Sequence, residues 1–217
     1  MDRAVLLVKL PSREPAFPIG LASLVGPLRN AGWGAAGCDL DAGDFRAGLD
    51  GLRAGRFRAV GISVMSGQVA IAASVVKRVR AVAPGVPVLI GGPHPTLFPQ
   101  DALRATGADV AVRGDGEPVV AAAVEAATGD GPLPAGCATW RDGRFETFGA
   151  PSFAKDLDAL PDPDRTFLPA VRYGRAYLGV RYPHAPVVSS RGCGSFCPWC
   201  SGPAIAPLGF RARSAER

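Results

Sequence analysis

Short apolar runs alternate with longer segments of helical periodicity over the first 130 residues of the chain. The runs are almost uninterrupted, which is typical of strands buried on both faces of a sheet. In the longer segments apolar residues recur about every 3.6 positions, as Val69, Ala72, Val76 and Val79 do. The expected strands are 4–10, 34–40, 57–64, 86–90 and 108–112, and the expected helices are 19–30, 45–54, 68–82, 100–106 and 116–128.

Five successive strand–helix units predict an α/β fold with a doubly wound, flavodoxin-like parallel sheet. Right-handed crossovers place the loops that follow the strands on one edge of such a sheet. With the strand order 2-1-3-4-5, a ligand crevice opens at this edge between the first and third strands. The loops expected to face the ligand are 11–18, 64–68 and 91–99, with 113–117 beside them.

The alternation of strands and helices ends after residue 135. Two β-rich segments, 137–140 and 144–148, are joined by Asp142-Gly143 and predict a small hairpin. The Pro/Asp-rich stretch 157–167 indicates a linker, and the apolar run 185–190 indicates one more strand. We therefore expect an α/β domain at 1–135, a hairpin and linker at 136–183, and the start of another domain at 184–217.

Composition excludes two broad classes of protein. With 47% hydrophobic and 20% charged residues, the 217-residue chain can bury a core and is not a disordered tail. No stretch approaches the roughly 18 uninterrupted apolar residues of a membrane span. The first apolar run is short and interrupted by Lys9, which argues against a signal peptide. The chain is therefore expected to be soluble and cytoplasmic, without a membrane partner.

The net charge of +5 is concentrated at the C-terminal end. Up to Asp164 there are 16 basic and 18 acidic residues, whereas from Arg165 onward eight arginines face Glu216 alone. Such a segment could contact nucleic acid or an anionic cofactor. Alternatively, its arginines have acidic partners elsewhere on the chain.

Three of the five cysteines form a C-x3-C-x2-C pattern: Cys193, Cys197 and Cys200. An odd number of cysteines without a signal peptide does not suit a disulfide framework. A structural zinc site needs four protein ligands, and no fourth is evident nearby. Three thiolates on one tight loop suit a [4Fe–4S] cluster with one open iron position, and zinc is the alternative.

The residues around these cysteines fit a cluster site. Gly192 and Gly194 allow the backbone to wrap closely, and Phe196 and Trp199 can shield a cluster from water. The other two cysteines, Cys38 and Cys137, fall in predicted strands and are interpreted as buried small hydrophobes.

The segment S-S-R-G-C-G-S-F-C-P-W-C at 189–200 resembles the cysteine loop of the radical S-adenosylmethionine (SAM) enzymes. The preceding part is similar to the cobalamin-binding domain found in many of these proteins. The matching pieces are P-I-G-L-A-S-L at 18–24, V-G-I-S-V-M-S at 60–66, I-G-G-P-H-P-T at 90–96, V-R-G-D-G-E at 112–117 and L-P-D-P-D-R at 160–165.

The resemblance implies three cofactors: a [4Fe–4S] cluster on the three cysteines, SAM on its unique iron, and cobalamin. It places Trp199 near the SAM adenine and implies an external electron donor such as flavodoxin or ferredoxin. The implied reaction is methyl transfer to an unactivated carbon of a small-molecule substrate, through a 5′-deoxyadenosyl radical and methylcobalamin. Only the start of the family's (β/α) barrel is present, so a non-catalytic cofactor-binding module is one alternative. A zinc-stabilised nucleic-acid binder is the other.

The loops at the predicted sheet edge supply the small and hydroxyl residues that a corrin needs. The candidate cobalamin contacts are Ser63, Ser66, Gly67, Gly91, Gly92, His94 and Thr96. The chain lacks the D-x-H-x-x-G motif that places a histidine below cobalt in many cobalamin proteins. His94 is therefore interpreted as a hydrogen-bond donor to a ligand or a structural group, with axial ligation as the alternative. Glu117 is interpreted as a first-turn partner of a helix dipole, with a ligand contact as the second interpretation.

Overall fold

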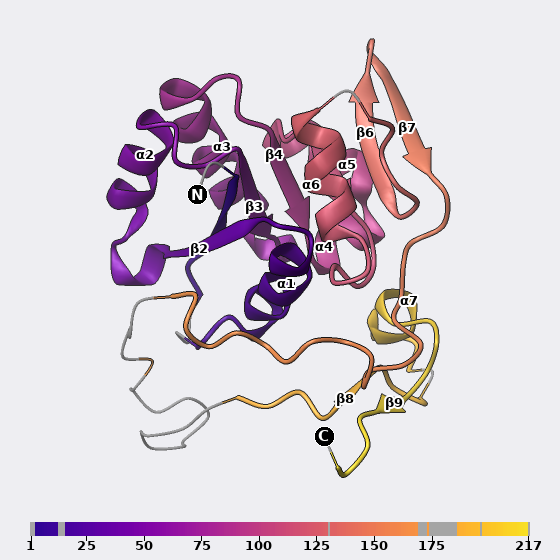
Figure 1. The fold of residues 1–217 in the computed structure, drawn as a ribbon. Helices are drawn as coiled ribbons and strands as arrows, with labels where there is room; N and C mark the ends of the chain where they lie inside the picture. The colour runs from indigo at the N-terminus through magenta and orange to yellow at the C-terminus, as the bar shows by residue number, and fades with distance from the viewer. Residues whose placement is uncertain are drawn as a thin grey trace.

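A seven-stranded sheet in the order β2-β1-β3-β4-β5-β6-β7 forms the centre of the molecule (Figure 1). It is seen in a computed structural model that describes residues 3–12, 16–129, 131–168, 173, 186–195 and 197–216. The strands of the sheet are β1 Ala4–Lys9, β2 Gly34–Asp39, β3 Ala59–Ser63, β4 Val88–Gly91, β5 Val110–Val112, β6 Cys137–Arg141 and β7 Arg144–Phe148. The helices around it are α1 Ile19–Asn30, α2 Phe45–Arg53, α3 Val69–Val82, α4 Pro93–Leu97, α5 Pro99–Thr106 and α6 Val120–Thr128, with short 3₁₀ turns at Leu40–Ala42 and Ser66–Gln68.

The five N-terminal strands run parallel in the order 2-1-3-4-5, which confirms the predicted doubly wound, flavodoxin-like sheet. Because these strands are parallel, their carboxyl ends meet at a single edge. The loops that follow β1, β3, β4 and β5 therefore converge there, as the sequence predicted.

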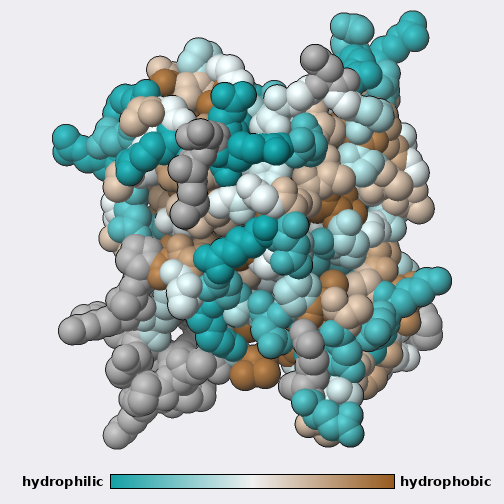
Figure 2. Space-filling model, viewed as in Figure 1, coloured by the Kyte–Doolittle hydropathy of each residue, from teal (hydrophilic) through white to brown (hydrophobic). Residues whose placement is uncertain are grey.

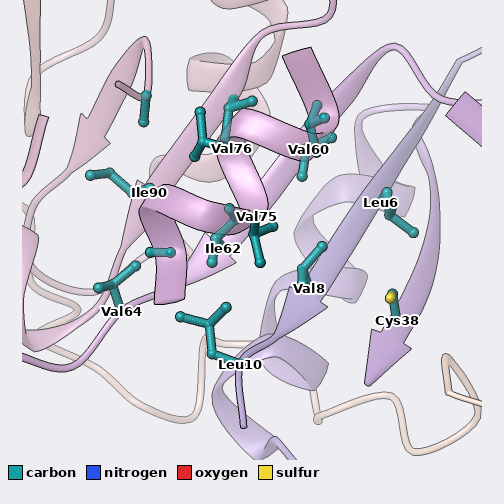
Figure 3. Close-up of a cluster of buried hydrophobic side chains, with 14 of the residues drawn as sticks. Leu6, Val8, Leu10, Cys38, Val60, Ile62, Val64, Val75, Val76 and Ile90 are labelled. Atoms are coloured by element: carbon teal, nitrogen blue, oxygen red, sulfur yellow. The ribbon is translucent and has the colours of Figure 1, made fainter. Parts of the chain in front are cut away.

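Each face of the sheet carries its own apolar cluster. One cluster packs β-strand residues such as Leu6, Ile62 and Ile90 against α2, α3 and α5 (Figure 3). The other packs Val5, Leu7, Leu89 and their neighbours against α1 and α6. Successive residues of β1 point to opposite faces, and both faces are buried. This explains why the strand sequences are apolar runs without polar alternation.

The predicted hairpin is present, and it extends the main sheet. β6 pairs antiparallel with β5, and β7 pairs with β6. The turn residues Asp142 and Gly143 both have positive φ, at 49° and 74°, which suits a tight hairpin turn. Residues 137–148 therefore belong to the sheet, and the three-part division of the chain remains a prediction.

The Pro/Asp-rich linker has no helix or strand between 153 and 168. It crosses α1, where the amide of Asp164 donates to the carbonyl of Ala22 at 3.0 Å. Further on, the carbonyl of Phe167 accepts from the amide of Gly37 in the edge strand β2. The linker thus covers an edge that would otherwise expose unpaired amides.

Hydrophilic side chains lie across the middle of the face viewed in Figure 1 (Figure 2).

Two sequence-based predictions were wrong in detail. The loop predicted at 91–99 contains α4, because Pro93 occupies the first turn of a helix, where a missing amide hydrogen costs nothing. The strand predicted at 185–190 is reduced to β8, Ser190–Arg191, since its ladder partner β9, Arg211–Ala212, also has two residues. Residue 185 lies outside the described residues. A short helix, α7 (Gly202–Ile205), lies between β8 and β9.

None of the described helices is both long enough and apolar enough to cross a membrane.

Candidate cofactor site at the carboxyl edge of the sheet

A cavity of about 330 Å³ opens on the α1/α6 side of the sheet, beneath the carboxyl ends of β3, β4 and β5. Aliphatic residues of β1, β4 and β5 form its base, and α1 and α6 form two of its walls. Among the sequence-predicted contacts, Ser63, Gly91 and Gly92 line this cavity. Its position is the one that doubly wound sheets use for ligands.

The cavity exists because β3 carries small residues on this face. Gly61 and Ser63 are two positions apart and both line the cavity, and Ile62, which also borders it, belongs to the apolar cluster on the opposite face. A Cβ atom on Gly61 would lie 2.9 Å from Cδ2 of Leu7. Gly61 was not identified from the sequence, although the alternation in V-G-I-S places it on the face of Ser63.

Gly92 closes the loop after β4 onto β3. Its φ is +99°, and a Cβ atom there would lie 3.1 Å from Oγ of Ser63 and 3.2 Å from the backbone nitrogen and oxygen of Val64. A side chain at this position would therefore be strained and crowded.

Thr96 is part of the scaffold beside this loop. Its Oγ1 donates to the carbonyl of Gly92 at 2.8 Å and accepts from the amide of Gly114 at 2.9 Å. It thus joins the loops after β4 and β5.

His94 does not line the cavity. Its buried ring packs on Phe98, with Nδ1 3.1 Å from Oγ of Ser66 and Nε2 3.7 Å from a carboxylate oxygen of Asp101. Nδ1 thus has a hydrogen-bond partner, whereas Nε2 is buried without one and lies on the side of Asp101. Because His94 lies outside the cavity lining, the axial-ligand alternative gains no support from this arrangement. Ser66 and Gly67 lie exposed at the same edge, outside the cavity.

Glu117 has a different role from the one expected. Helix α6 begins at Val120, so Glu117 precedes it and is not a first-turn residue. Its buried carboxylate instead accepts from both terminal nitrogens of Arg191, with Nη1 at 3.2 Å from Oε2. Nη1 of Arg191 also lies 3.1 Å from Oδ1 of Asp115. Asp115, Glu117 and Arg191 all line the cavity.

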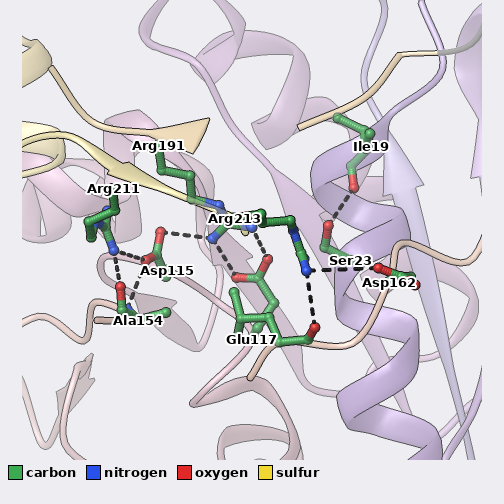
Figure 4. A network of polar contacts seen from close by, with 10 residues as sticks. Ile19, Ser23, Asp115, Glu117, Ala154, Asp162, Arg191, Arg211 and Arg213 are labelled. Atoms are coloured by element: carbon green, nitrogen blue, oxygen red, sulfur yellow. Dashed lines mark hydrogen bonds and ion pairs between the residues drawn. The ribbon is translucent and has the colours of Figure 1, made fainter. Parts of the chain in front are cut away.

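Further arginines of the C-terminal segment join this network (Figure 4). Arg211 contacts Oδ2 of Asp115 at 3.3 Å and donates to the carbonyl of Ala154. Arg213 donates to the carbonyl of Leu160 at 3.5 Å and lies 3.8 Å from Oδ1 of Asp162. Three of the four arginines that the structure describes from 165 onward thus have acidic partners, in line with the second interpretation of the charge. The fourth, Arg165, lies outside this network and donates to the carbonyl of Pro186.

Burial and charge act in opposite directions on Arg191. Burial alone lowers the pKa of the Arg191 guanidinium, but the hydrogen bond to Glu117 and the charges of Glu117 and Asp115 outweigh it. The pKa of Arg191 is therefore raised above its usual value, and the ion pair stays charged at physiological pH.

The cysteine loop lies between β8 and β9. Cys193 and Cys200 are exposed, and each sulfur accepts from a backbone amide, that of Ser195 at 3.4 Å and that of Gly202 at 3.3 Å. Amide donors of this kind stabilise thiolates and tune iron–sulfur clusters. The Trp199 side chain is 85% exposed on the same loop. Phe196 lies outside the described residues.

The three sulfurs are not gathered around one point. Among the described residues, which include all three cysteines, no group of three or more His, Cys, Asp or Glu side chains is placed to hold a metal ion. The assignment of Cys193, Cys197 and Cys200 as cluster ligands remains a prediction, supported by the exposure of Cys193 and Cys200 and by the amide–sulfur bonds that these two make.

Comparison with known protein families identifies the sheet and its cavity. Residues 6–124, more than half of the chain, match the B12 binding domain family. The chain belongs to this family. The cavity and the sheet edge described above therefore lie within a B12-binding domain.

Individual relatives extend the likeness beyond this domain. Over 161 residues the chain is 29% identical to an uncharacterized methyltransferase, PH0819, from Pyrococcus horikoshii, which corresponds to 73% of this chain and 34% of that protein. The fold also matches the radical SAM methyltransferase TsrM from Kitasatospora setae, in a structure with cobalamin and a [4Fe–4S] cluster bound. That match has a TM-score of 0.73 and 19% identity over 99% of this chain and 44% of the other.

A second solved structure is the cobalamin-dependent SAM radical enzyme OxsB with aqua-cobalamin and SAM bound, with a TM-score of 0.75 and 18% identity. This match covers 99% of the present chain and 30% of OxsB. The predicted resemblance to cobalamin-binding radical SAM proteins is thus confirmed at the level of the fold. The chain spans about a third of the curated relative and less than half of either solved structure.

The five cysteines should fall into two groups by their reactivity toward a thiol-alkylating reagent. Burial, with the charges of Asp44 and Asp39, raises the pKa of Cys38 to about 12, and burial raises that of Cys137 to about 11. Because only the thiolate reacts, both should remain unmodified by iodoacetamide near pH 8. Peptide mass spectrometry should find label on Cys193, Cys197 and Cys200 in the native protein, and on all five in denaturant. Native labelling of Cys38 or Cys137 at the rate of the loop cysteines would contradict the structure.

Proposed function

We propose that this chain is the cobalamin-binding portion of a cobalamin-dependent radical SAM methyltransferase that acts on an unactivated carbon of a small molecule. One observation carries the proposal: a small-residue cavity opens at the carboxyl edge of a B12-binding domain, and a C-x3-C-x2-C loop is held at its mouth. The name of the Pyrococcus relative supports methyl transfer as the reaction class.

The size of the cavity indicates which part of cobalamin it takes. At about 330 Å³ it lies at the lower end of the range for ligand pockets and is too small for the whole cofactor. Its aliphatic lining suits the flat base of the nucleotide tail. Ser63, Gly91 and Gly92 at its mouth, with Ser66 and Gly67 on the exposed side of the edge, would then contact the tail or the corrin. When bound, cobalamin would supply the methyl-carrying cobalt.

The cysteine loop would hold the second cofactor. Cys193, Cys197 and Cys200 would ligate a [4Fe–4S] cluster and leave one iron for SAM, with Trp199 beside it on the loop. A bound cluster would supply the electron that cleaves SAM, and a small redox protein such as flavodoxin or ferredoxin would deliver that electron. Five free cysteines fit a reducing compartment such as the cytoplasm.

A non-catalytic cobalamin-binding module is the second candidate. It is favoured by the positions of the three cysteine sulfurs, which are not gathered around one point. The zinc-stabilised nucleic-acid hypothesis gains no support from the described residues, since the four arginines described from 165 onward contact the protein itself.

Filling the cavity should weaken cobalamin binding. In the Gly61→Val variant a branched side chain, of a kind favoured in strands, would project into the cavity from β3 and displace the end of the Leu7 side chain. Titration with hydroxocobalamin, followed by absorption and gel filtration, should show affinity weakened by about tenfold or more, or ~1.4 kcal/mol.

The matched control is Val60→Ala, the preceding residue of the same strand, which packs in the apolar cluster on the opposite face and does not line the cavity. It should cost roughly 1.5–3 kcal/mol of stability and leave cobalamin affinity unchanged. Equal affinities for Gly61→Val and the unmodified protein would contradict the cavity assignment, as would equal weakening by Val60→Ala.

The cluster ligands are tested by anaerobic reconstitution with iron and sulfide. The unmodified chain should acquire the broad visible absorption of an iron–sulfur cluster, and Cys200→Ser should lose most of it. Cys137→Ser is the control, because Cys137 is buried in β6 far from the loop in sequence, and it should keep the absorption. Colourless zinc binding by the unmodified chain, or an equal loss in both variants, would overturn the ligand assignment.

A further inference from the structure

The loop that carries the three cysteines is closed at its base. Strands β8 and β9 pair antiparallel there, with Arg191 opposite Arg211. Next to this pair, Gly192 has a φ of +85°, and a Cβ atom on it would lie 1.9 Å from the carbonyl oxygen of Gly209. The two strands therefore approach so closely that only glycine fits, and residues 190–212 form one closed unit, here called the cysteine module.

Apolar packing does little to hold the cysteine module on the sheet domain. None of the residues described between 186 and 216 is buried. Its large apolar side chains are largely in solvent, with Trp199 at 85% and Phe210 at 65% exposure. Another interaction must fix its position.

Ion pairs supply that interaction, and they converge on one loop. Both strands at the base of the cysteine module place an arginine on Asp115, with Arg191 at 3.1 Å and Arg211 at 3.3 Å. Arg191 also forms a two-pronged pair with Glu117, whose side chain is 5% exposed (Figure 4). Breaking a buried pair of this geometry leaves an uncompensated charge, which makes it far stronger than a surface ion pair.

The same carboxylates also belong to the cavity wall. Asp115, Glu117 and Arg191 line the cavity, together with Val188 from the segment that leads into the cysteine module. Arg191 is two residues from Cys193 in the sequence. The contact that holds the cysteine loop is therefore also part of the mouth of the cavity.

We propose that Asp115 and Glu117 are positioning residues that hold the cysteine module at the mouth of the cavity, through Arg191 and Arg211. The loop that carries the cysteines is thereby fixed to the wall of the cavity through its base. The role toward cobalamin rests on the proposed function, whereas the anchoring itself does not.

Hydrogen exchange of the full chain without cofactors tests the anchor. The Glu117→Gln variant should speed amide exchange across 190–195 and 197–212 by about tenfold and leave β3 and β4 unchanged. The control is Asp50→Asn, which removes an exposed pair with Arg53 on α2 and should change exchange in the cysteine module less than about twofold. Unchanged exchange in Glu117→Gln, or equal acceleration throughout the sheet, would overturn the proposal.

A double variant tests the pairing itself. Because Arg191 also pairs with Asp115, whereas Glu117 contacts the module through Arg191, the combined Glu117→Gln and Arg191→Gln variant should exchange within about twofold of Arg191→Gln alone. Effects of the two substitutions that multiply would show independent actions and overturn the assignment.

Hydrogen exchange in saturating hydroxocobalamin then distinguishes a positioning role of Glu117 from a purely structural one. In the unmodified protein it should slow exchange in the cysteine module, whereas Glu117→Gln, with binding verified by its corrin spectrum, should show no such protection. Equal protection in both proteins would overturn the positioning role. If the unmodified protein binds no hydroxocobalamin, the proposed function fails, and the cofactor-free comparison still decides the anchor.

Discussion

The glycines on one face of β3 and in the loop after β4 leave the cavity on which ligand binding by this molecule depends. A parallel sheet is normally packed on both faces, and here the α2/α3/α5 face is filled to the ends of the strands. On the α1/α6 face, Gly61, Gly91 and Gly92 leave a cavity at the carboxyl edge. The rest of the sheet domain is rigid apolar packing, so the cavity is preformed and does not require the sheet to open.

Ion pairs hold the cysteine module on the sheet domain, where apolar packing is sparse. The cysteine module buries none of its described residues, yet two arginines from its base meet carboxylates of the loop after β5. Placing the pairs on Asp115 and Glu117 joins the part of the chain that matches the B12 binding domain to the part that carries the cysteine motif. It also gives a role to three described arginines of the basic C-terminal quarter, because Arg191, Arg211 and Arg213 contact the sheet domain and the linker.

Much of this architecture could be predicted from the sequence, because apolar runs and helical periodicity are local signals. Ser63 and the Gly91-Gly92 pair were predicted for the same reason, since the end of an apolar run shows where a strand ends. Gly61 was missed because a glycine inside a strand suggests a ligand site only when the face of the sheet on which it lies is considered. The pairing of Glu117 with Arg191 spans 74 positions and depends on how the cysteine module folds back, which no local pattern encodes. His94 was placed among ligand contacts by its loop, but its ring turns toward Ser66 and Asp101.

The central claim is that the glycine-lined cavity accepts the nucleotide tail of cobalamin. Comparing the affinities of cobalamin and cobinamide, a corrinoid that lacks this tail, by isothermal titration calorimetry tests it most directly. The account predicts that cobalamin binds at least about tenfold more tightly, because the tail alone can enter the cavity. Equal affinities for the two corrinoids would show that the cavity takes no part in binding and would contradict the account.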